Sequence, residues 1–355
     1  IKQLTDALAA DESLGLEPEN IVIAATHAHS SPDFIGGWGF VPNWYMAQIT
    51  EAIKSTAKQA VMSMEAATLE AGEEEARAYN SERRQTYRSA EEASISWVRA
   101  VAVDRTAPAP AETTEASPAP GRSDEAPGKP ASSPSPTAAP AGPRVIATLG
   151  AYAAHPVTFG TNDGVAHPDW VGLFNQRVEQ RFGGIGMHFM TGLGNLTGAN
   201  KTTGGKLADL LPDVGAGRPV DDTTVKVAQG TATSALTNVP LTALGTPGLF
   251  DRKFNPTPAV VRTGENPNAP CVSTSPQSVE LPFSAARIGN DLVFSAAPGE
   301  VFANFTNTVE EKNAGRITFA LAQANDALGY MPQSFEINPV GQQGLGFVAG
   351  GYLFV

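Results

Sequence analysis

The sequence predicts an α/β fold in which a mixed β-sheet forms the core and helices flank it. Three observations support this prediction. Strand-like apolar segments alternate with amphipathic segments of helical period along most of the 355 residues. Hydrophobic residues make up 41% of the chain, which is enough for a sizeable core. Some neighbouring strand-like segments have no helix between them, so antiparallel hairpins are expected as well.

The predicted elements follow one another without an internal repeat. Helical spacing predicts helices at residues 1–10, 42–64, 169–182, 220–237 and 302–313. Apolar and β-branched runs predict strands at residues 21–25, 67–71, 94–103, 145–153, 187–190 and 287–294. By length, residues 1–355 could form one large domain or two smaller ones.

A change in composition interrupts this order at residues 107–143. This stretch is rich in Ala, Pro and Ser and contains no Phe, Leu, Ile or Trp. It cannot bury apolar surface, so we predict a disordered insert. Both of its flanks are strand-like, which predicts that the insert is the loop of a hairpin between two neighbours in the sheet.

Charge and cysteine content restrict the function classes. The formal net charge is −12, which argues against nucleic acid as a partner and against electrostatic docking on an anionic membrane. Cys271 is the only cysteine, so an intrachain disulfide and a cysteine-based zinc site are excluded. Cys271 lies in a loop-like stretch, P-N-A-P-C-V-S, and a catalytic thiol is not favoured there.

The ends of the chain carry little information about targeting. No stretch approaches the roughly 18–20 apolar residues of a membrane span. The chain begins without Met in a helix-like segment, so we expect an N-terminal truncation and a signal region outside the sequence.

Polar residues follow three of the predicted strands. Residues 23–34 read I-A-A-T-H-A-H-S-S-P-D-F, and strand alternation would put His27 and His29 on one face. His155 follows A-T-L-G-A-Y-A-A, and Glu300 follows L-V-F-S-A-A-P-G. Functional groups gather at strand ends in α/β sheets. Two neutral imidazoles and a carboxylate are the ligands of a catalytic zinc with an open position.

Each of these signals also has a structural interpretation. A single buried histidine is more often a hydrogen-bonded core residue than a ligand, and we expect this of His188 in G-M-H-F-M. Glu300 alone could be a carboxylate that stabilises a helix N-terminus. No local zinc motif applies because the residues are far apart in the sequence.

Several motifs resemble those of the neutral ceramidase family, also called neutral/alkaline non-lysosomal ceramidases. T-H-A-H-S-S-P-D resembles the family's T-H-T-H-S-x-P segment, and A-Y-A-A-H-P-V-T resembles its second histidine strand. D-W-V-G-L is similar to an Asp-x-x-Gly turn, and A-A-P-G-E-V-F-A-N to a P-G-E-[FL]-T segment. A-N-D-A-L-G-Y-M-P resembles N-x-Y-x-x-Y-[IV], and the late G-G-Y resembles the last tyrosine motif. The order is preserved, so the resemblance covers nearly the whole chain.

The resemblance implies a zinc site and assigns roles by motif. The implied zinc ligands are His27, His155, Glu300 and Tyr352. The implied catalytic residues are His29, which donates to the oxyanion, Tyr330 beside the substrate carbonyl, Arg83 or Arg84, and Thr197. Arg83 is preferred over Arg84, although N-S-E-R-R-Q-T-Y-R is equally typical of a solvated charge run.

The chain also departs from the family pattern. The family's G-D-V-S-P-N corresponds to G-N-L-T-G-A here, which puts Thr197 at the serine position and Asn195 at the aspartate position. A threonine hydroxyl can do serine chemistry, but its β-branch restricts χ1. His167, in G-V-A-H-P-D-W, is a candidate pocket residue or partner of a ligand. The C-terminal β-sandwich domain usual in the family has no counterpart in this sequence, and the insert is not a family feature.

The implied function is that of a zinc-dependent hydrolase that cleaves the N-acyl amide bond of ceramide or a related N-acyl lipid. Two alternatives remain: an esterase or lactonase that uses the same metal centre, and a non-catalytic homologue that binds a ligand. The expected partner is a lipid-like small molecule, with transient contact to a membrane surface left open. The family resemblance implies a secreted or cell-envelope location, and the Ala- and Pro-rich composition is typical of bacteria. Acyl chain, head group and oligomeric state stay open.

Overall fold

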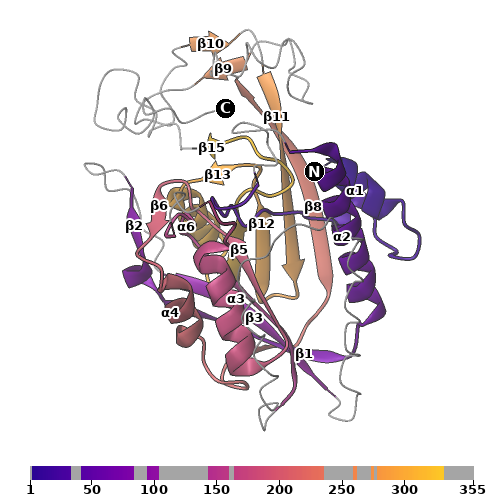
Figure 1. Cartoon of the computed structure of the whole chain (residues 1–355), viewed down its shortest axis with the longest axis vertical. Coiled ribbons are helices and arrows are strands. Elements are labelled where there is room, and N and C mark those ends of the chain that lie inside the picture. The colour runs from indigo at the N-terminus through magenta and orange to yellow at the C-terminus, as the bar shows by residue number, and fades with distance from the viewer. Residues whose placement is uncertain are drawn as a thin grey trace, which may run out of the picture.

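Two mixed β-sheets that pack against each other form the core of the molecule, and helices surround them (Figure 1). The predicted α/β class with a mixed-sheet core is therefore confirmed, with two main sheets in the described part of the chain. The structure, a computed structural model, describes residues 2–32, 41–83, 94–103, 143–159, 164–235, 259–261, 273–275 and 278–331.

The first sheet has the spatial order β5-β4-β3-β1-β7. Its strands are β1 (Ala67–Glu75), β3 (Ser94–Ala102), β4 (Val145–Tyr152), β5 (Ile185–Met190) and β7 (Arg218–Val220). Only β4 and β5 run parallel. The antiparallel pairing of β3 with β4 confirms the hairpin predicted around the insert. The insert itself, except residue 143, lies outside the described residues.

The second sheet has the order β14-β12-β11-β8. Its strands are β8 (Val225–Ala235), β11 (Ser278–Ile288), β12 (Leu292–Ala296) and β14 (Ile317–Leu321). β12 and β14 are parallel and are connected through α6 (Ala303–Lys312). This β-α-β unit places Glu300 just beyond the carboxyl end of β12, where such sheets usually carry functional groups.

Two apolar layers hold the strands in place. The outer layer packs α3 (Asp169–Phe182) and α4 (Thr203–Leu210) on the first sheet and contains, among others, Trp97, Tyr152, Trp170, Phe174 and Leu207. The inner layer joins the two sheets and contains Ala71, Ala151, Leu292, Phe319 and Leu321, among others. Each large side chain buried in this way contributes about 1.5–3 kcal/mol. The layers therefore fix the strand ends that carry the polar residues.

The N-terminal helices pack together beside β8. α1 (Lys2–Ala9), the 3-10 turn η1 (Pro18–Asn20) and α2 (Asn43–Met62) share a small cluster of Leu8, Leu14 and Ile21 with Ala57 and Val61. The short elements are η2 (Arg77–Tyr79), β2 (Asn80–Glu82), β6 (Leu196–Gly198), β9 (Ala259–Val261), β10 (Ser273–Ser275), β13 (Glu300–Val301) and β15 (Tyr330–Met331). None of the described helices is both long and apolar enough to span a bilayer.

Most predicted elements are confirmed with small shifts at their ends. These are the helices at 1–10, 42–64, 169–182 and 302–313 and the strands at 67–71, 94–103, 145–153 and 187–190.

The prediction of a helix at residues 220–237 is wrong, because this segment contains the strand β8. β8 pairs with β11 over its full length, from Val225 opposite Ile288 to Ala235 opposite Ser278. The β-branched residues of V-K-V-A-Q-G-T-A-T all lie at odd positions of the segment, and this period of two suits a strand. Pairing along a whole neighbouring strand outweighs weak helix propensity.

Two predicted strands are also corrected. Residues 21–25 form no strand and make a single bridge, between Ala24 and Ala324. The strand predicted at 287–294 is two strands, β11 and β12, separated by a tight turn. Gly289 allows this turn because its φ of 55° lies in the left-handed region that side chains disfavour.

The carboxyl of Glu310, on α6, gives the fold a pH dependence. Burial first, then the nearby charges of Glu73 and Glu311, raises its pKa from 4.5 to about 7. A raised carboxyl pKa adds stability that is complete below pH 4.5 and is lost as the pH rises through 7. We expect Glu310→Gln to raise the free energy of unfolding at pH 8 by about 1–3 kcal/mol and to change it little at pH 5.

Chemical denaturation at both pH values measures this effect. Glu311→Gln, at an exposed position next to Glu310, is the charge-matched control and should stabilise less than Glu310→Gln at pH 8, because Glu311 is the smallest of the three causes of the raised pKa. Equal stabilisation by both variants would show that general charge repulsion, not the burial of Glu310, is responsible.

Candidate metal centre

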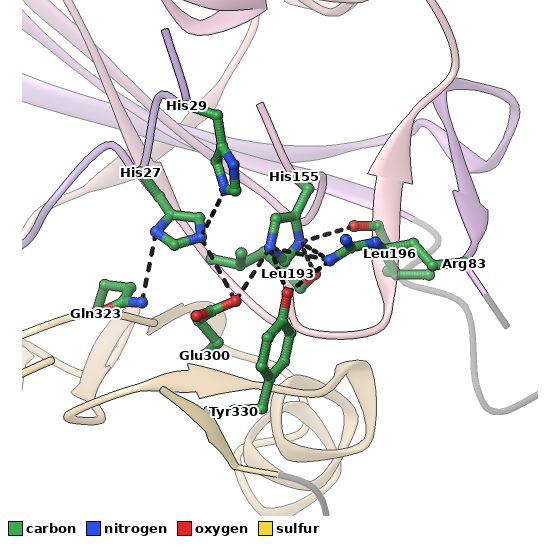
Figure 2. A network of polar contacts seen from close by, with 9 residues as sticks. All are labelled: His27, His29, Arg83, His155, Leu193, Leu196, Glu300, Gln323 and Tyr330. Carbon is green, nitrogen blue, oxygen red and sulfur yellow. Dashed lines mark hydrogen bonds and ion pairs between the residues drawn. The ribbon is translucent and has the colours of Figure 1, made fainter. Parts of the chain in front are cut away.

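Separate segments of the chain meet at one small polar region, and their side chains converge there (Figure 2). His27 follows the segment 21–25, His155 follows β4, and Glu300 begins β13. β13 pairs in parallel with β15, so that Glu300 lies opposite Tyr330. The strand-end pattern seen in the sequence thus places these groups in one region of the fold.

The side chains of His27 and His29 lie together, as predicted, but a turn of the backbone brings them together and not the alternation of a strand. His27 has a φ of 59°, in the left-handed region, and the backbone turns there. The two Nε2 atoms lie 3.2 Å apart, with the rings edge to face. The N–H of His29 donates to the carbonyl of Pro156 at 3.3 Å, which ties this segment to the loop that carries His155.

The proton on His155 can be placed from its neighbours. Its Nδ1 lies 2.7 Å from the carbonyl oxygen of Leu193, and a carbonyl only accepts, so Nδ1 carries the proton. Nε2 then presents its lone pair toward the cluster. Burial first, and then the charges of Arg83 and His27, lowers the pKa of His155 to about 4. The ring is therefore neutral near pH 7, as a metal ligand must be.

Glu300 is the negative member of the cluster. Its Oε2 lies 3.0 Å from Nε2 of His155 and 3.4 Å from Nε2 of His27. Burial opposes its ionisation, but the contact with Nε2 of His27, which can donate to the carboxylate, outweighs burial and holds its pKa well below the usual range. The carboxyl is therefore ionised at neutral pH.

Arg83 and Tyr330 complete one side of the cluster. Nη1 of Arg83 donates to the phenol oxygen of Tyr330 at 2.8 Å, and that oxygen lies 3.2 Å from Nε2 of His155. The Tyr330 ring stacks on the His155 ring. Arg83 thus supplies a positive charge beside two candidate ligand atoms.

The spacing of these atoms matches a metal site. Four ligand atoms at 2.0–2.1 Å from a tetrahedral zinc lie about 3.3 Å from one another. The contacts among His27, His155, Glu300 and Tyr330 are 3.0, 3.2 and 3.4 Å. The three histidines also place their ligand atoms within 4.8 Å of one another. The donor set, two imidazoles with a carboxylate and a phenol, therefore fits a divalent metal such as zinc.

His29 lies at the exposed side of the cluster. Surrounding protein atoms first, and then the neighbouring His27, lower its pKa to about 4. A neutral imidazole of this kind donates one hydrogen bond and accepts another. His29 is thus placed to interact with a group that approaches the centre from solvent.

Thr197 lies directly beside His155. Its backbone bridges His155 in parallel and pairs with Ser81 through β2 and β6. Tyr352 and Arg84, two further residues from the motif comparison, lie outside the described residues, as does Cys271.

Asn195 connects Arg83 with the segment after Glu300. Its carbonyl accepts the N–H of Arg83 at 2.8 Å, and its Oδ1 accepts the N–H of Ala303 at 2.8 Å. Its Nδ2 donates to Glu82 at 2.9 Å. An aspartate here would present oxygen to the Glu82 carboxylate. The amide of Asn195 therefore suits the Glu82 carboxylate better than an aspartate would. No pattern in the sequence predicted that Asn195 joins these segments.

His167 and Asp169 shape the loop after His155. His167 lies outside the histidine cluster, bridges Ser30, and accepts the N–H of Asp169 on Nδ1 at 2.9 Å. Asp169 is fully buried and accepts four hydrogen bonds, from the backbone and hydroxyl of Thr158 and the N–H groups of Phe159 and Trp170. The predicted Asp-x-x-Gly turn thus acts as a support for the loop.

His188 is buried in the core, away from the other histidines, packed edge to face against Trp170 and Phe174. The core position was predicted, but the expected hydrogen bond is absent, because neither ring nitrogen has a partner among the described residues. Burial lowers the pKa of His188 to about 3, so it stays neutral.

Gln323 is a residue that the sequence analysis missed. It is buried, and its Nε2 lies 3.5 Å from Nδ1 of His27. The sequence does contain a signal for Gln323, because this polar residue follows the apolar run I-T-F-A-L-A, which contains β14, and so lies at a strand end like His155 and Glu300.

Comparison with solved structures identifies the fold. The neutral ceramidase of Pseudomonas aeruginosa matches with a TM-score of 0.59 and 14% identity, over 93% of this chain and 58% of that one. A ceramidase complexed with C2 matches with a TM-score of 0.59 and 14% identity, over 97% of this chain and 61% of that one. The chain has the neutral ceramidase-like fold. It spans about three fifths of the length of these ceramidase structures.

The likeness to the ceramidases is carried by the three-dimensional structure. No protein-family profile matches the sequence, and no curated protein matches it. At 14% identity the comparison establishes the fold, so the chemistry of the site has to be argued from its own residues.

Asp169 provides a test of how the His155 loop is held. We expect Asp169→Asn to lower the free energy of unfolding by about 1–3 kcal/mol, because one oxygen is replaced by an NH₂ group that faces backbone donors. Asp222→Asn is the control, since Asp222 is exposed and accepts from Thr224 within a surface turn. Denaturant titration measures both variants. Equal small losses would mean that the buried acceptor is not what fixes the loop.

Proposed function

We propose that this chain is a zinc-dependent hydrolase of the ceramidase type, which cleaves the N-acyl amide bond of ceramide or a related N-acyl lipid. One observation carries the proposal. Two imidazoles, an ionised carboxylate and a phenol meet in a ceramidase-like fold, with contacts of 3.0, 3.2 and 3.4 Å between their donor atoms. In this proposal the whole chain, residues 1–355, is one catalytic domain with an insert at 107–143.

His27, His155 and Glu300 are the proposed metal ligands. Tyr330 supplies the fourth ligand atom in the described part of the chain, because its oxygen lies 3.2 Å from Nε2 of His155. The sequence motifs instead assigned this place to Tyr352 and a catalytic role to Tyr330. The two assignments predict different results for Tyr330→Phe: lost metal in the first case, and lost turnover with metal retained in the second.

A zinc ion held by these residues would polarise the substrate carbonyl and would lower the pKa of a bound water molecule toward 7. The protein groups around it orient the amide and stabilise the charge that develops on its oxygen. Arg83 is positively charged, and His29 is neutral with a ring N–H to donate. Donors placed in this way typically contribute about 10²–10³-fold each to the rate. Thr197, beside His155, is the proposed hydroxyl group of the site.

The substrate class and location follow the same reasoning. A lipid-like small molecule is the proposed substrate because both structural neighbours are ceramidases. Secretion or a cell-envelope location is proposed from the family resemblance, and the acidic charge of −12 argues against nucleic acid. An esterase or lactonase would use the same centre, so substrate assays have to separate the two.

Metal stoichiometry tests the centre directly. We expect about one zinc per chain in the wild type and loss of that zinc in His27→Ala and in His155→Ala, because each variant removes one ligand. His188→Phe is the matched control, since it removes a buried histidine that has no hydrogen bond and lies outside the cluster. Elemental analysis after dialysis gives the answer. Wild-type protein without metal, even after zinc is added back, would contradict the hydrolase mechanism.

Turnover tests the chemistry. With a short-chain N-acyl sphingoid amide, we expect Arg83→Met to lower kcat by about 10²–10³-fold while zinc is retained, because a donor to the oxyanion is lost. Thr197→Ser is the control inside the site and should keep or raise the rate. A large loss in Thr197→Ser would show that this position was assigned wrongly. Cleavage of the matching ester with no cleavage of the amide would favour the esterase alternative.

A further inference from the structure

The turn that follows β14 contacts two of the proposed ligand segments at once. The carbonyl of Gln323 accepts the N–H of Ala25, two residues before His27, at 3.1 Å. The N–H of Gln323 donates to the carbonyl of Gly299, next to Glu300, at 2.9 Å. One residue therefore connects the His27 segment to the Glu300 segment through its backbone.

This residue also has an unfavourable backbone conformation. Gln323 has a φ of 50° and is 2% exposed. The left-handed region suits Gly, Asn and Asp, and a glutamine there has a cost of order 1 kcal/mol or more. Asn325, at φ 65°, fits the usual preference. A strained, buried glutamine suggests that its side chain has a role that glycine or asparagine could not fill.

The side chain of Gln323 reaches the ring of His27. Its amide nitrogen lies 3.5 Å from Nδ1, on the side of the ring opposite to Glu300 (Figure 2). Nε2 of His27 faces His29 and Glu300. If Nε2 binds the metal, the single proton of the neutral ring must sit on Nδ1, and Nδ1 then needs an acceptor. A half-turn of the amide exchanges its nitrogen for its oxygen and provides that acceptor.

The second histidine shows the same arrangement with a different acceptor. Nδ1 of His155 donates to the carbonyl of Leu193 at 2.7 Å, which fixes its proton away from the cluster. For His27, the polar group near Nδ1 in the described part of the chain is the Gln323 amide. The two ligands thus have one acceptor each, a backbone carbonyl in one case and a side-chain amide in the other.

We propose that Gln323 is a positioning residue that fixes the proton and the ring orientation of His27 for metal binding. This inference rests on the proposed function, because it needs a metal at Nε2. The amide oxygen of Gln323 accepts the Nδ1–H of His27 when the metal is bound. Ring tautomerisation moves the proton from Nε2 to Nδ1 and leaves the net charge unchanged.

Zinc affinity, measured by competition with a chromogenic chelator, tests the assignment. Gln323→Met keeps the length of the side chain and the strained backbone conformation of residue 323, but it removes the acceptor oxygen. We expect its zinc affinity to fall by about 10–100-fold, the usual effect of losing such a partner. Gln323→Glu restores an acceptor oxygen and should bind zinc at least ten times more tightly than Gln323→Met.

Asn325→Gly is the matched control for a purely structural effect. It removes the hydrogen bonds of Asn325 to Ile23 and Ser284, from the same turn, without touching His27. We expect it to lower the Tm and to leave the zinc affinity within about threefold. Comparable loss of affinity in Asn325→Gly and Gln323→Met would overturn the inference, because general loosening of the turn would then explain both.

Nitrogen NMR of the wild-type protein gives a second readout that needs no variant at Gln323. In the zinc-loaded protein, ¹⁵N shifts of the His27 ring should show a protonated Nδ1 and a metal-bound Nε2. A metal-bound Nδ1 would overturn the assignment of Gln323 while leaving a metal centre in place. Wild-type protein that binds no zinc would instead overturn the proposed function, and the Gln323 assignment with it.

Discussion

The arrangement of the site depends on the approach of two electron-rich atoms, Nε2 of His155 and Oε2 of Glu300, which lie 3.0 Å apart. The carbonyl of Leu193 places the His155 proton on Nδ1, so neither of the two atoms has a proton to share with the other. Such a contact is unfavourable unless a positive charge lies against both atoms. Arg83 provides part of this charge, but its Nη1 lies against the imidazole ring and the phenol of Tyr330. A divalent cation placed between the two atoms would neutralise the repulsion between both lone pairs directly.

The scaffold around this pair explains why it can persist. In the β-α-β unit of β12, α6 and β14, Glu300 lies in the connection between β12 and α6. His155 lies just after β4, a strand of the other sheet. Asn195 joins the two sides, since it binds the backbone of both Arg83 and Ala303. Large apolar side chains in the layers above and below fix the strands. Such rigidity is what a preorganised site needs, because ligand atoms must stay in place before the metal or the substrate arrives.

Several parts of the fold and site could be predicted from sequence because their signals are local. The alternation of strands and helices gave the α/β class, and apolar runs that end in His155 and Glu300 gave two proposed ligands. The failures arose where long-range contacts decide the outcome. β8 is a strand because β11 pairs with it along its whole length, whereas residues 21–25 make one bridge, to Ala324, within the part of the chain that the structure describes. The approach of His27 to His29 depends on the left-handed backbone conformation of His27. The role proposed for Gln323 depends on its contact with Nδ1 of His27, 296 positions away in the sequence.

The position of Tyr330 follows from the same scaffold. The parallel pairing of β13 with β15 fixes Glu300 opposite Tyr330, and the phenol then stacks on the ring of His155. Its oxygen is therefore held by backbone register on one side and by ring stacking on the other. Arg83 donates a hydrogen bond to this oxygen and so places a positive charge beside it. Arg83 thus joins the phenol of Tyr330 to the imidazole of His155 on one side of the cluster.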